Sequence, residues 1–382
     1  MIKRNIYLLC AISLLQGMVF YAPVATLYRQ AAGLGIFHIT LIESISFLLT
    51  ILLEIPWGWA ADRMGYRRTM VLCCLVYVVS KIIFWQAAGF GGFLLERLLL
   101  SIVCAGLSGV DSSMLFLSCG EENSHRVFGI YNNAGELGML AAALIYAVWI
   151  QEDYRLAAFL TVLTYGLAAV LSLGLQEVSP KKSSPAQSAG REMLGTLKQQ
   201  LANRNLLLLL LSAALLSQVH QSVTVFLNQL QYTRSGMCHR GISAAFLLVS
   251  LAGLTGTFSA RGCAVFGARR MGTGLFLVSS LSCLLMAVFP IPWLSVLAVL
   301  LLRTAFSLMM PLQTQLQHRL VTTGNRASEL SANAVIQDSL GIFLNLLLGY
   351  AAEESLTSAL LLGSLLCAMG LWFYHQSQRT GK

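Results

Sequence analysis

Apolar stretches of about 20 residues, separated by short polar breaks, recur along the whole chain. An α-helix rises ~1.5 Å per residue, so a stretch of this length crosses the ~30 Å hydrocarbon core of a bilayer. We predict twelve spans, over residues 5–27, 39–61, 69–88, 92–117, 127–150, 155–175, 206–230, 241–261, 271–289, 293–316, 327–350 and 356–374. The chain is therefore expected to be an all-α, multi-pass membrane protein whose loops are too short for a folded soluble domain.

The composition excludes a soluble protein, because hydrophobic residues make up 57% of the chain and charged residues 11%. The net charge of +9 does not indicate a nucleic-acid partner, since the basic residues are sorted by loop. With the N-terminus placed inside, 18 of the 25 Lys and Arg residues fall on the cytoplasmic side and four on the outer side. This asymmetry predicts cytoplasmic termini in a plasma membrane, the inner membrane of a bacterium.

The longest polar interruption, Gln176–Asn205, divides the chain into two sets of six spans. We predict an N-terminal six-helix bundle over 1–178, a cytoplasmic linker over 179–204 and a C-terminal six-helix bundle over 205–382. Basic features repeat at similar offsets: Gly65-Tyr-Arg67-Arg68 and Gly267-Ala-Arg269-Arg270 by 202 residues, Arg97 and Arg303 by 206, Arg126 and Arg326 by 200. The repetition predicts two pseudo-symmetric bundles.

A charged motif follows the second span. Its members are Gly58, Asp62, Arg63, Gly65, Arg67 and Arg68. The first glycine allows two helices to approach closely, and the aspartate at the helix end can accept hydrogen bonds from an arginine. In the second half Ala264 takes the place of the aspartate. The alternative is that the arginines serve as topology anchors alone.

Twelve spans in a six-plus-six arrangement, a long middle loop and this motif resemble the major facilitator superfamily over the whole chain. The resemblance implies two bundles that alternate access to a midplane site, with the motif as a gating latch. Arg97 resembles the fourth-span arginine of proton-coupled exporters, and Glu54-Ile-Pro56-Trp-Gly58 resembles small bacterial efflux-type members. The fifth span reads Asn133-Ala-Gly135-Glu136-Leu-Gly138 and lacks the proline of the drug-antiporter motif.

Two spans carry polar stripes at helical spacing. The second has Glu43, Ser46, Thr50, Glu54 and Gly58, and the fourth has Arg97, Ser101, Cys104, Ser108 and Asp111. Polar groups that face lipid are costly, so these stripes predict the lining of a polar cavity. Tight packing of small residues is the alternative.

Two acidic residues are placed deep in the membrane by their sequence position. Glu136 lies ten residues after Arg126 and Asp338 twelve after Arg326, about 15 and about 18 Å along a helix. A carboxyl group there can take up and release a proton during transport. We rank Glu136 first as proton carrier, then Glu54 and Asp338, with Arg97 as a further coupling candidate. The alternative is a structural ion pair or a protonated, hydrogen-bonded acid with no role in transport.

The remaining charges within spans are the bases Lys81 and Arg303 and several acids. Glu43, Glu96, Asp111 and Glu329 lie near span ends, so we expect them to reach the membrane interface.

Amide and aromatic side chains supply candidates for contact with a substrate. Together with one carboxylate, they are Gln16, Tyr21, Asp111, Gln218, Gln221, Asn228 and Gln313. In the seventh span, Gln218, Gln221 and Asn228 fall within about 80° of a regular helix, with His220 off that face. Hydrogen bonds between helices are an equally good explanation of these amides, and we expect a packed, satisfied histidine at His220.

The sequence holds no feature of an enzyme. It has no P-loop, no cluster at metal-ligand spacing, no nucleophilic triad and no CxxC pair among nine cysteines. We expect neither cofactor nor metal.

The expected function is proton-coupled transport of small molecules, most simply efflux of amphipathic or cationic compounds attracted by an acid-lined cavity. The partners would be the solute, protons and the lipid bilayer, with the chain acting as a monomer. The first alternative is a proton-coupled importer of a small nutrient. The second is a non-transporting sensor or scaffold on the same fold, which would be indifferent to neutralisation of Asp62 and Glu136.

Overall fold

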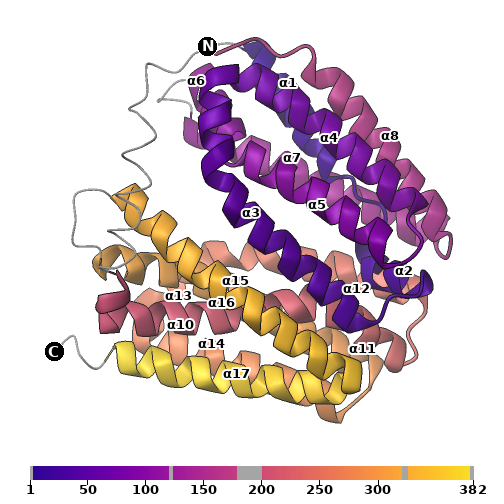
Figure 1. Cartoon of the computed structure of the whole chain (residues 1–382). Helices are drawn as coiled ribbons and strands as arrows, with labels where there is room; N and C mark the ends of the chain where they lie inside the picture. Colours follow the sequence, from indigo (N-terminus) through magenta and orange to yellow (C-terminus); the bar gives the residue numbers. More distant parts are fainter. Residues whose placement is uncertain (1–2, 120–123, 179–199, 321–325, 379–382) are drawn as a thin grey trace. The chain divides into compact units, whose positions relative to one another are not determined.

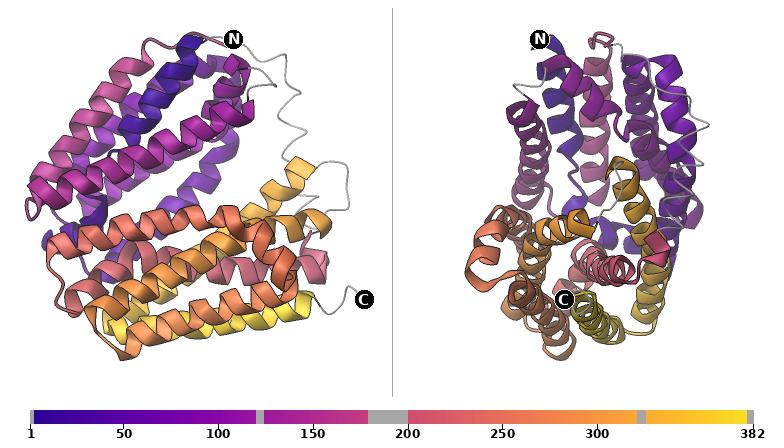
Figure 2. Two further views of the ribbon diagram at one scale, coloured as in Figure 1. Left: turned by 180° about the vertical axis from the view of Figure 1, so that it is seen from behind. Right: turned by 90° about the vertical axis from the view of Figure 1, so that its left-hand side faces the viewer.

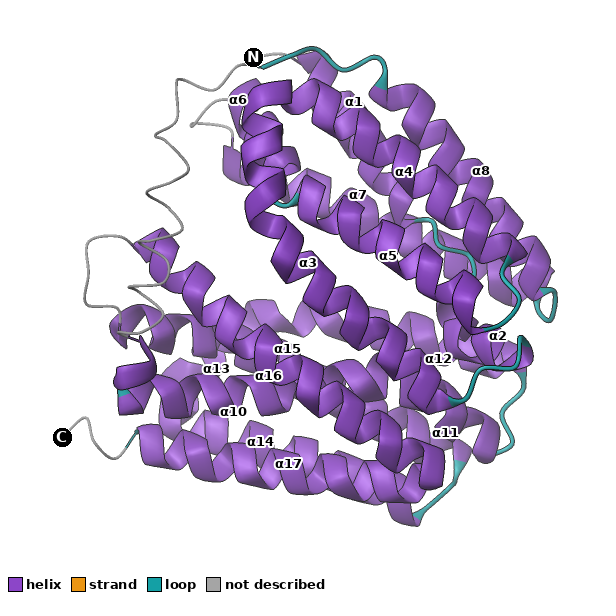
Figure 3. Ribbon diagram, in the orientation of Figure 1, coloured by secondary structure: helices purple, strands orange, loops and turns teal. Residues whose placement is uncertain are grey.

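The structure, a computed structural model, describes residues 3–119, 124–178, 200–320 and 326–378. Its described elements are helices joined by short loops, without a strand among them (Figure 3). Within these ranges, twelve helical stretches are long and apolar enough to cross a membrane, which confirms the predicted all-α, twelve-span fold. Residues 179–199, most of the predicted linker, lie outside the described ranges.

The chain divides into two compact units. Unit 1 comprises Met1–Leu34 and Ile45–Ala186, and unit 2 comprises Gly35–Ser44 and Gln187–Lys382. The helices of unit 1 are α1 (Lys3–Gly17), η1 (Ala22–Val24), α2 (Ala25–Ala31), most of α3 (Ile36–Met64), α4 (Tyr66–Gln86), α5 (Phe90–Leu107), α6 (Val110–Cys119), α7 (Ser124–Ile145), η3 (Tyr146–Ile150) and α8 (Tyr154–Ser172) (Figure 1).

Unit 2 contains the first turns of α3, and its next described helix follows residues 179–199. Its other helices are α10 (Arg204–Gln221), η4 (Ser222–Leu227), α11 (Asn228–Arg234), α12 (His239–Ala252), η5 (Gly253–Phe258), α13 (Ser259–Phe266), α14 (Ala268–Val288), α15 (Pro292–Leu320), α16 (Arg326–Glu354) and α17 (Leu356–Ser377). Figure 2 shows α14, α15 and α17 side by side in this unit, in agreement with their contacts.

In unit 1, α1 packs against α7 and α8, and α4 packs against α5 and α8. Glycines bring α1 and α7 into backbone contact, because a Cβ added at Gly17 would meet the carbonyl of Gly135 and one added at Gly138 would meet that of Leu14. Small residues are the usual means of close helix packing in membranes. The unit therefore holds its helices with few bulky side chains at this crossing.

In unit 2, α14 packs against α15 and α17, and α10 against α16 and α17. Tyr374 of α17 is fully buried and donates a hydrogen bond to the carbonyl of Ala268 at 2.9 Å, which fixes the start of α14. The first turns of α3 join the unit through α16. Asn345 Nδ2 donates to Ser44 Oγ at 3.2 Å, and Phe37 N donates to Glu353 Oε2 at 3.0 Å.

Several spans depart from a regular helix. The fourth is broken between α5 and α6, where Gly109 has a φ of 77°. The fifth ends in the π-helical η3, the seventh contains the π-helical η4, and the eighth contains the 3₁₀ segment η5. A π-helical turn holds one extra residue and rotates the face that follows it by about 100°. Polar stripes drawn on regular helices are therefore interrupted at these places.

Candidate functional site

A buried ion pair joins α4 and α5 in unit 1. Lys81 of α4 and Glu96 of α5 approach to 3.1 Å, and their side chains are 5% and 1% exposed. The loop of three residues between the two helices brings these charges together across a tight hairpin. The expectation that Glu96 reaches the membrane interface is wrong. Glu43, expected to do the same, is also buried.

Aromatic rings surround the Lys81 ammonium group. Its Nζ donates to the Tyr21 hydroxyl at 3.1 Å and lies 5.9 Å from the ring centre of Tyr77 and 5.5 Å from that of Tyr165. A cation above an aromatic ring is stabilised by the negative face of the ring. The rings and Glu96 together make it possible to keep a lysine within the membrane-spanning part of the chain.

Two of the predicted substrate residues, Gln16 of α1 and Tyr21 just before η1, lie at this cluster. Tyr21 stacks on Phe84 with ring centres 4.1 Å apart. Gln16 accepts a hydrogen bond from the Tyr165 hydroxyl through its carbonyl at 2.7 Å, and its side chain contacts Cys74. Arg29, buried beside them, places its guanidinium 5.7 Å from the Phe84 ring centre. The region is thus rich in both aromatic and basic groups.

The polar stripes of the second and fourth spans face each other in unit 1. Ser46 and Ser101 hydroxyls lie 2.6 Å apart, and Ser108 Oγ contacts Glu54 Oε1 at 3.5 Å. Arg97 is half-buried on α5, and its carbonyl accepts a bond from Ser101. Two side-chain contacts between helices, one between serines and one with Glu54, therefore join the stripes.

Asp111 lies past the break at Gly109, on α6, where it accepts a 3.0 Å bond from the Tyr131 hydroxyl of α7. The prediction of one continuous stripe from Arg97 to Asp111 is therefore wrong, because a glycine with positive φ ends α5 before Asp111. Asp111, half-buried, ties the fourth span to the fifth.

The charged motif is tied to the end of the sixth span. Gly65 caps α4 with a φ of 88°, a backbone conformation that other residues rarely adopt. Arg67 donates through its backbone N to Glu177 Oε1 at 3.3 Å and through its guanidinium to the carbonyl of Leu173 at 3.1 Å. Arg63 and Arg68 are exposed, whereas the side chain of Asp62 and the surroundings of Gly58 lie outside what the structure describes.

The three predicted proton carriers are all exposed. Glu54 lies on α3, Glu136 on α7 and Asp338 on α16, each within a candidate membrane span. A carboxylate in contact with lipid at such a depth is costly, so these groups require contact with water or a polar partner. Glu136 differs from Glu96 in this respect, since Glu96 is enclosed and paired.

Unit 2 contains a polar cluster that the sequence did not predict. Arg303 Nη1 of α15 contacts His220 Nε2 of α10 at 3.2 Å, and His220 stacks on Phe306 with ring centres 3.8 Å apart. Gly253, at the start of η5, leaves room for the guanidinium. The expectation of a packed, satisfied histidine is confirmed, and its partner is the in-span arginine.

The predicted amide face of the seventh span is not continuous. Gln218 is buried on α10 beside Gly341 of α16, and Gln221 is half-buried at the end of α10. Asn228 begins α11 after the π-helical η4, which rotates it away from the predicted arc of 80°. Asn228 Oδ1 accepts the backbone N–H of the next residue, and Gln313 is buried on α15.

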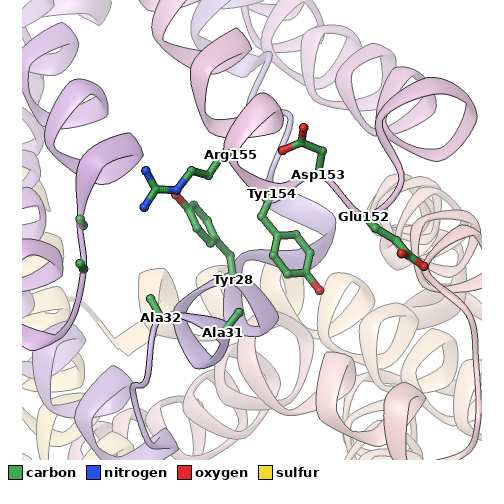
Figure 4. Close-up of a pocket in the computed structure, with 9 residues that line it drawn as sticks. Tyr28, Ala31, Ala32, Glu152, Asp153, Tyr154 and Arg155 are labelled. Carbon is green, nitrogen blue, oxygen red and sulfur yellow. The ribbon is translucent and has the colours of Figure 1, made fainter.

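A surface pocket of about 360 Å³ lies beside the start of α8 in unit 1 (Figure 4). It is lined by Tyr28, Ala31, Ala32, Ala87, Ala88, Glu152, Asp153, Tyr154 and Arg155. Asp153 also caps α8 by accepting the Leu156 N–H at 2.9 Å. Among the described residues, no group of His, Cys, Asp or Glu is placed to hold a metal ion.

Among the described residues, twelve apolar helices with charges and amides buried between them are the features of a multi-pass membrane protein. The sequence model of the Major Facilitator Superfamily matches residues 7–345, and the chain belongs to this superfamily of transporters, which is not a class of enzyme. The structure is similar to that of the nucleoside transporter NupG, with a TM-score of 0.84 and 14% identity over 98% of this chain and 99% of that one.

Two further comparisons, one of structure and one of sequence, also find transporters. A bacterial homolog of the human lysosomal transporter Spinster, in an inward-facing and unoccupied conformation, gives a TM-score of 0.78 at 16% identity over 99% of this chain and 97% of that one. An uncharacterized MFS-type transporter of Methanocaldococcus jannaschii is 24% identical over 178 residues, which cover 45% of each chain. The matched stretch thus spans less than half of that relative.

Proposed function

We propose that the protein is a proton-coupled secondary transporter that exports small amphipathic or cationic compounds by alternating access. The observation that carries the proposal is the exposure of Glu136 within a membrane-spanning helix. A carboxylate that exchanges protons with water must be accessible to water, and a lipid-facing position would be too costly. Glu54 and Asp338 share this property and add negative charge that attracts a cation.

In this proposal the remaining groups have separate roles. The motif from Gly58 to Arg68 acts as a latch, Arg97 assists proton coupling, and Gln16, Tyr21, Gln218 and Gln313 contact the solute. Both termini lie in the cytoplasm, the chain works as a monomer in a bacterial cell membrane, and the two bundles are the moving parts. The basic residues of the loops support this orientation.

The test measures accumulation of a fluorescent lipophilic cation in pump-deficient bacteria that express the chain. We expect lower accumulation than in control cells, lost on addition of a protonophore and in Glu136→Gln. Asp338→Asn is the matched variant, since Asp338 lies 202 residues after Glu136 and is exposed on the corresponding span. If the protonophore does not change accumulation of the cation, proton-driven export is contradicted.

A specific observation favours a second candidate, an importer of a small nutrient that carries an acidic or hydrogen-bond-accepting group. Two basic side chains, Arg29 and Lys81, are buried in unit 1 against the single buried carboxylate of that unit's described residues, Glu96. Excess positive charge in a low-dielectric site favours an anionic partner. Proteoliposomes with an entrapped pH dye separate the candidates when the solute is added outside. A solute that enters together with protons acidifies the lumen, whereas a cation that enters in exchange for protons makes the lumen more alkaline.

A further inference from the structure

The junction between α13 and α14 in unit 2 collects positive charge. Gly267 caps α14 with a φ of 76° and a ψ of 146°, and the exposed Arg269 and Arg270 occupy the first turn of that helix. The N-terminus of a helix carries a partial positive charge and leaves its first amides without acceptors in the helix. Two arginines at this end therefore repel the helix dipole, and an anion placed there relieves the repulsion.

In unit 1 the chain itself supplies such an anion. The corresponding junction at Gly65 has nearly the same dihedral angles, a φ of 88° and a ψ of 151°, and the Glu177 carboxylate accepts the N–H of Arg67. The sequence position 202 residues after Glu177 holds Arg379, which lies outside the described residues. Moreover, the helices α13, α14, α15 and α17 contain no Asp or Glu.

An apolar groove of about 560 Å³ lies beside the Gly267 junction. It is lined by Phe258, Arg261, Gly262, Val265, Phe266, Arg270, Met271, Gly274, Leu275 and Leu308. The Arg261 guanidinium lies 5.8 Å from the Phe258 ring centre, and both arginines are exposed. The groove thus combines an apolar surface with two basic groups at the ends of two candidate membrane spans.

We propose that this groove binds an anionic phospholipid, with the phosphate held by Arg261, Arg270 and the first turn of α14 and an acyl chain in the apolar part. A soluble anion would leave the apolar lining without a partner, and an uncharged lipid would leave the arginines and the helix end without one. The distribution of basic residues predicts that this end faces the cytoplasm, where bacterial and other inner leaflets present anionic headgroups to basic residues.

The experiment uses the purified full-length protein in a mild detergent, titrated with phosphatidylglycerol or phosphatidylcholine and read by native mass spectrometry. We expect phosphatidylglycerol to bind more tightly than phosphatidylcholine. The double variant Arg261→Gln/Arg270→Gln should lower the affinity for phosphatidylglycerol about tenfold or more, to the affinity for phosphatidylcholine. Lys3→Gln/Arg4→Gln is the matched control, since it removes the same charge from exposed residues of unit 1 on the same predicted side.

A second variant tests the apolar part of the groove. A Cβ added at Gly274 meets no atom within 4 Å, so the side chain of Gly274→Leu starts in open space at the groove and leaves both arginines in place. We expect it to weaken the binding of both lipids, with an unchanged elution profile on size exclusion.

Two results would overturn the proposal. The first is equal phosphatidylglycerol affinity in the arginine double variant and the Lys3/Arg4 control. The second is full displacement of the lipid by excess inorganic phosphate together with an unaffected Gly274→Leu, which would identify a site for soluble anions. Should the double variant fail to fold, Arg270→Gln alone is compared with the control. It is then expected to give a smaller loss of phosphatidylglycerol affinity.

Discussion

Unit 1 and unit 2 are both bundles of helices, but they differ in the charged residues that they bury. At the offsets set by Gly65 and Gly267 and by Arg97 and Arg303, Lys81 corresponds to Cys283 and Glu96 to Leu302. The first pair is a buried salt bridge, whereas Cys283 and Leu302 are fully buried and apolar. The fold therefore does not require an ion pair at this place, since unit 2 packs without one.

The two helix junctions differ in the same way. Gly65 and Gly267 have matching dihedral angles, but Glu177 accompanies the first and no atom lies within 4 Å of a Cβ added at the second. The backbone geometry is thus nearly the same at both junctions, whereas the charged partners differ. Charged groups present in one unit alone are for this reason the best places to look for function.

The largest expected effect comes from breaking the ion pair of unit 1. Lys81→Met leaves Glu96 as a buried, uncompensated charge, so we expect a loss of about 3–5 kcal/mol of stability. Thermal unfolding of the purified protein in detergent measures it.

The matching control replaces both members of the ion pair by apolar residues, as found at the corresponding positions of unit 2. Lys81→Met/Glu96→Leu should recover most of the lost stability, because well-packed apolar residues commonly replace a buried pair without cost. Transport should remain defective if the pair serves function. A double variant as unstable as Lys81→Met would contradict the comparison between the units.

The second effect compares the two junction glycines. Gly267→Ala meets backbone strain alone, which costs of the order of 1–3 kcal/mol in this region of φ and ψ. Gly65→Ala adds a close contact with the Glu177 carboxylate, 2.8 Å from the new Cβ, so its melting temperature should fall further. Equal losses for both variants would show that Glu177 does not constrain the junction.

The smallest expected effect concerns the carboxylate at the start of α4. Glu177→Gln keeps the shape of the side chain but removes the negative charge next to the positive helix end, a change of about 0.3–1 kcal/mol. Because salt screens this interaction, the loss should be larger at low than at high ionic strength. A chemical-denaturation series at two salt concentrations measures it, and a salt-independent loss would point to the hydrogen bond alone.

The spans and the junctions could be predicted from the sequence because hydropathy and glycine act locally. The partners of charged residues could not. Lys81 and Glu96 are 15 residues apart and Arg67 and Glu177 are 110 apart, so these contacts depend on how helices pack. The presence of Lys81 inside a span was the available signal, since such a charge demands a partner. The π-helical turn η4 has no comparable signal, and it displaced Asn228 from the predicted face.

The position of the ion pair also bears on how the chain enters the membrane during synthesis. A lysine within a span opposes insertion of that segment, by as much as about 2.5–3.5 kcal/mol at the centre of the helix. Here the compensating carboxylate is in the very next helix, joined through three residues, so α4 and α5 can leave the translocon as one hairpin in which Lys81 is already paired with Glu96. The lysine then never has to face lipid while it waits for a distant partner to be translated.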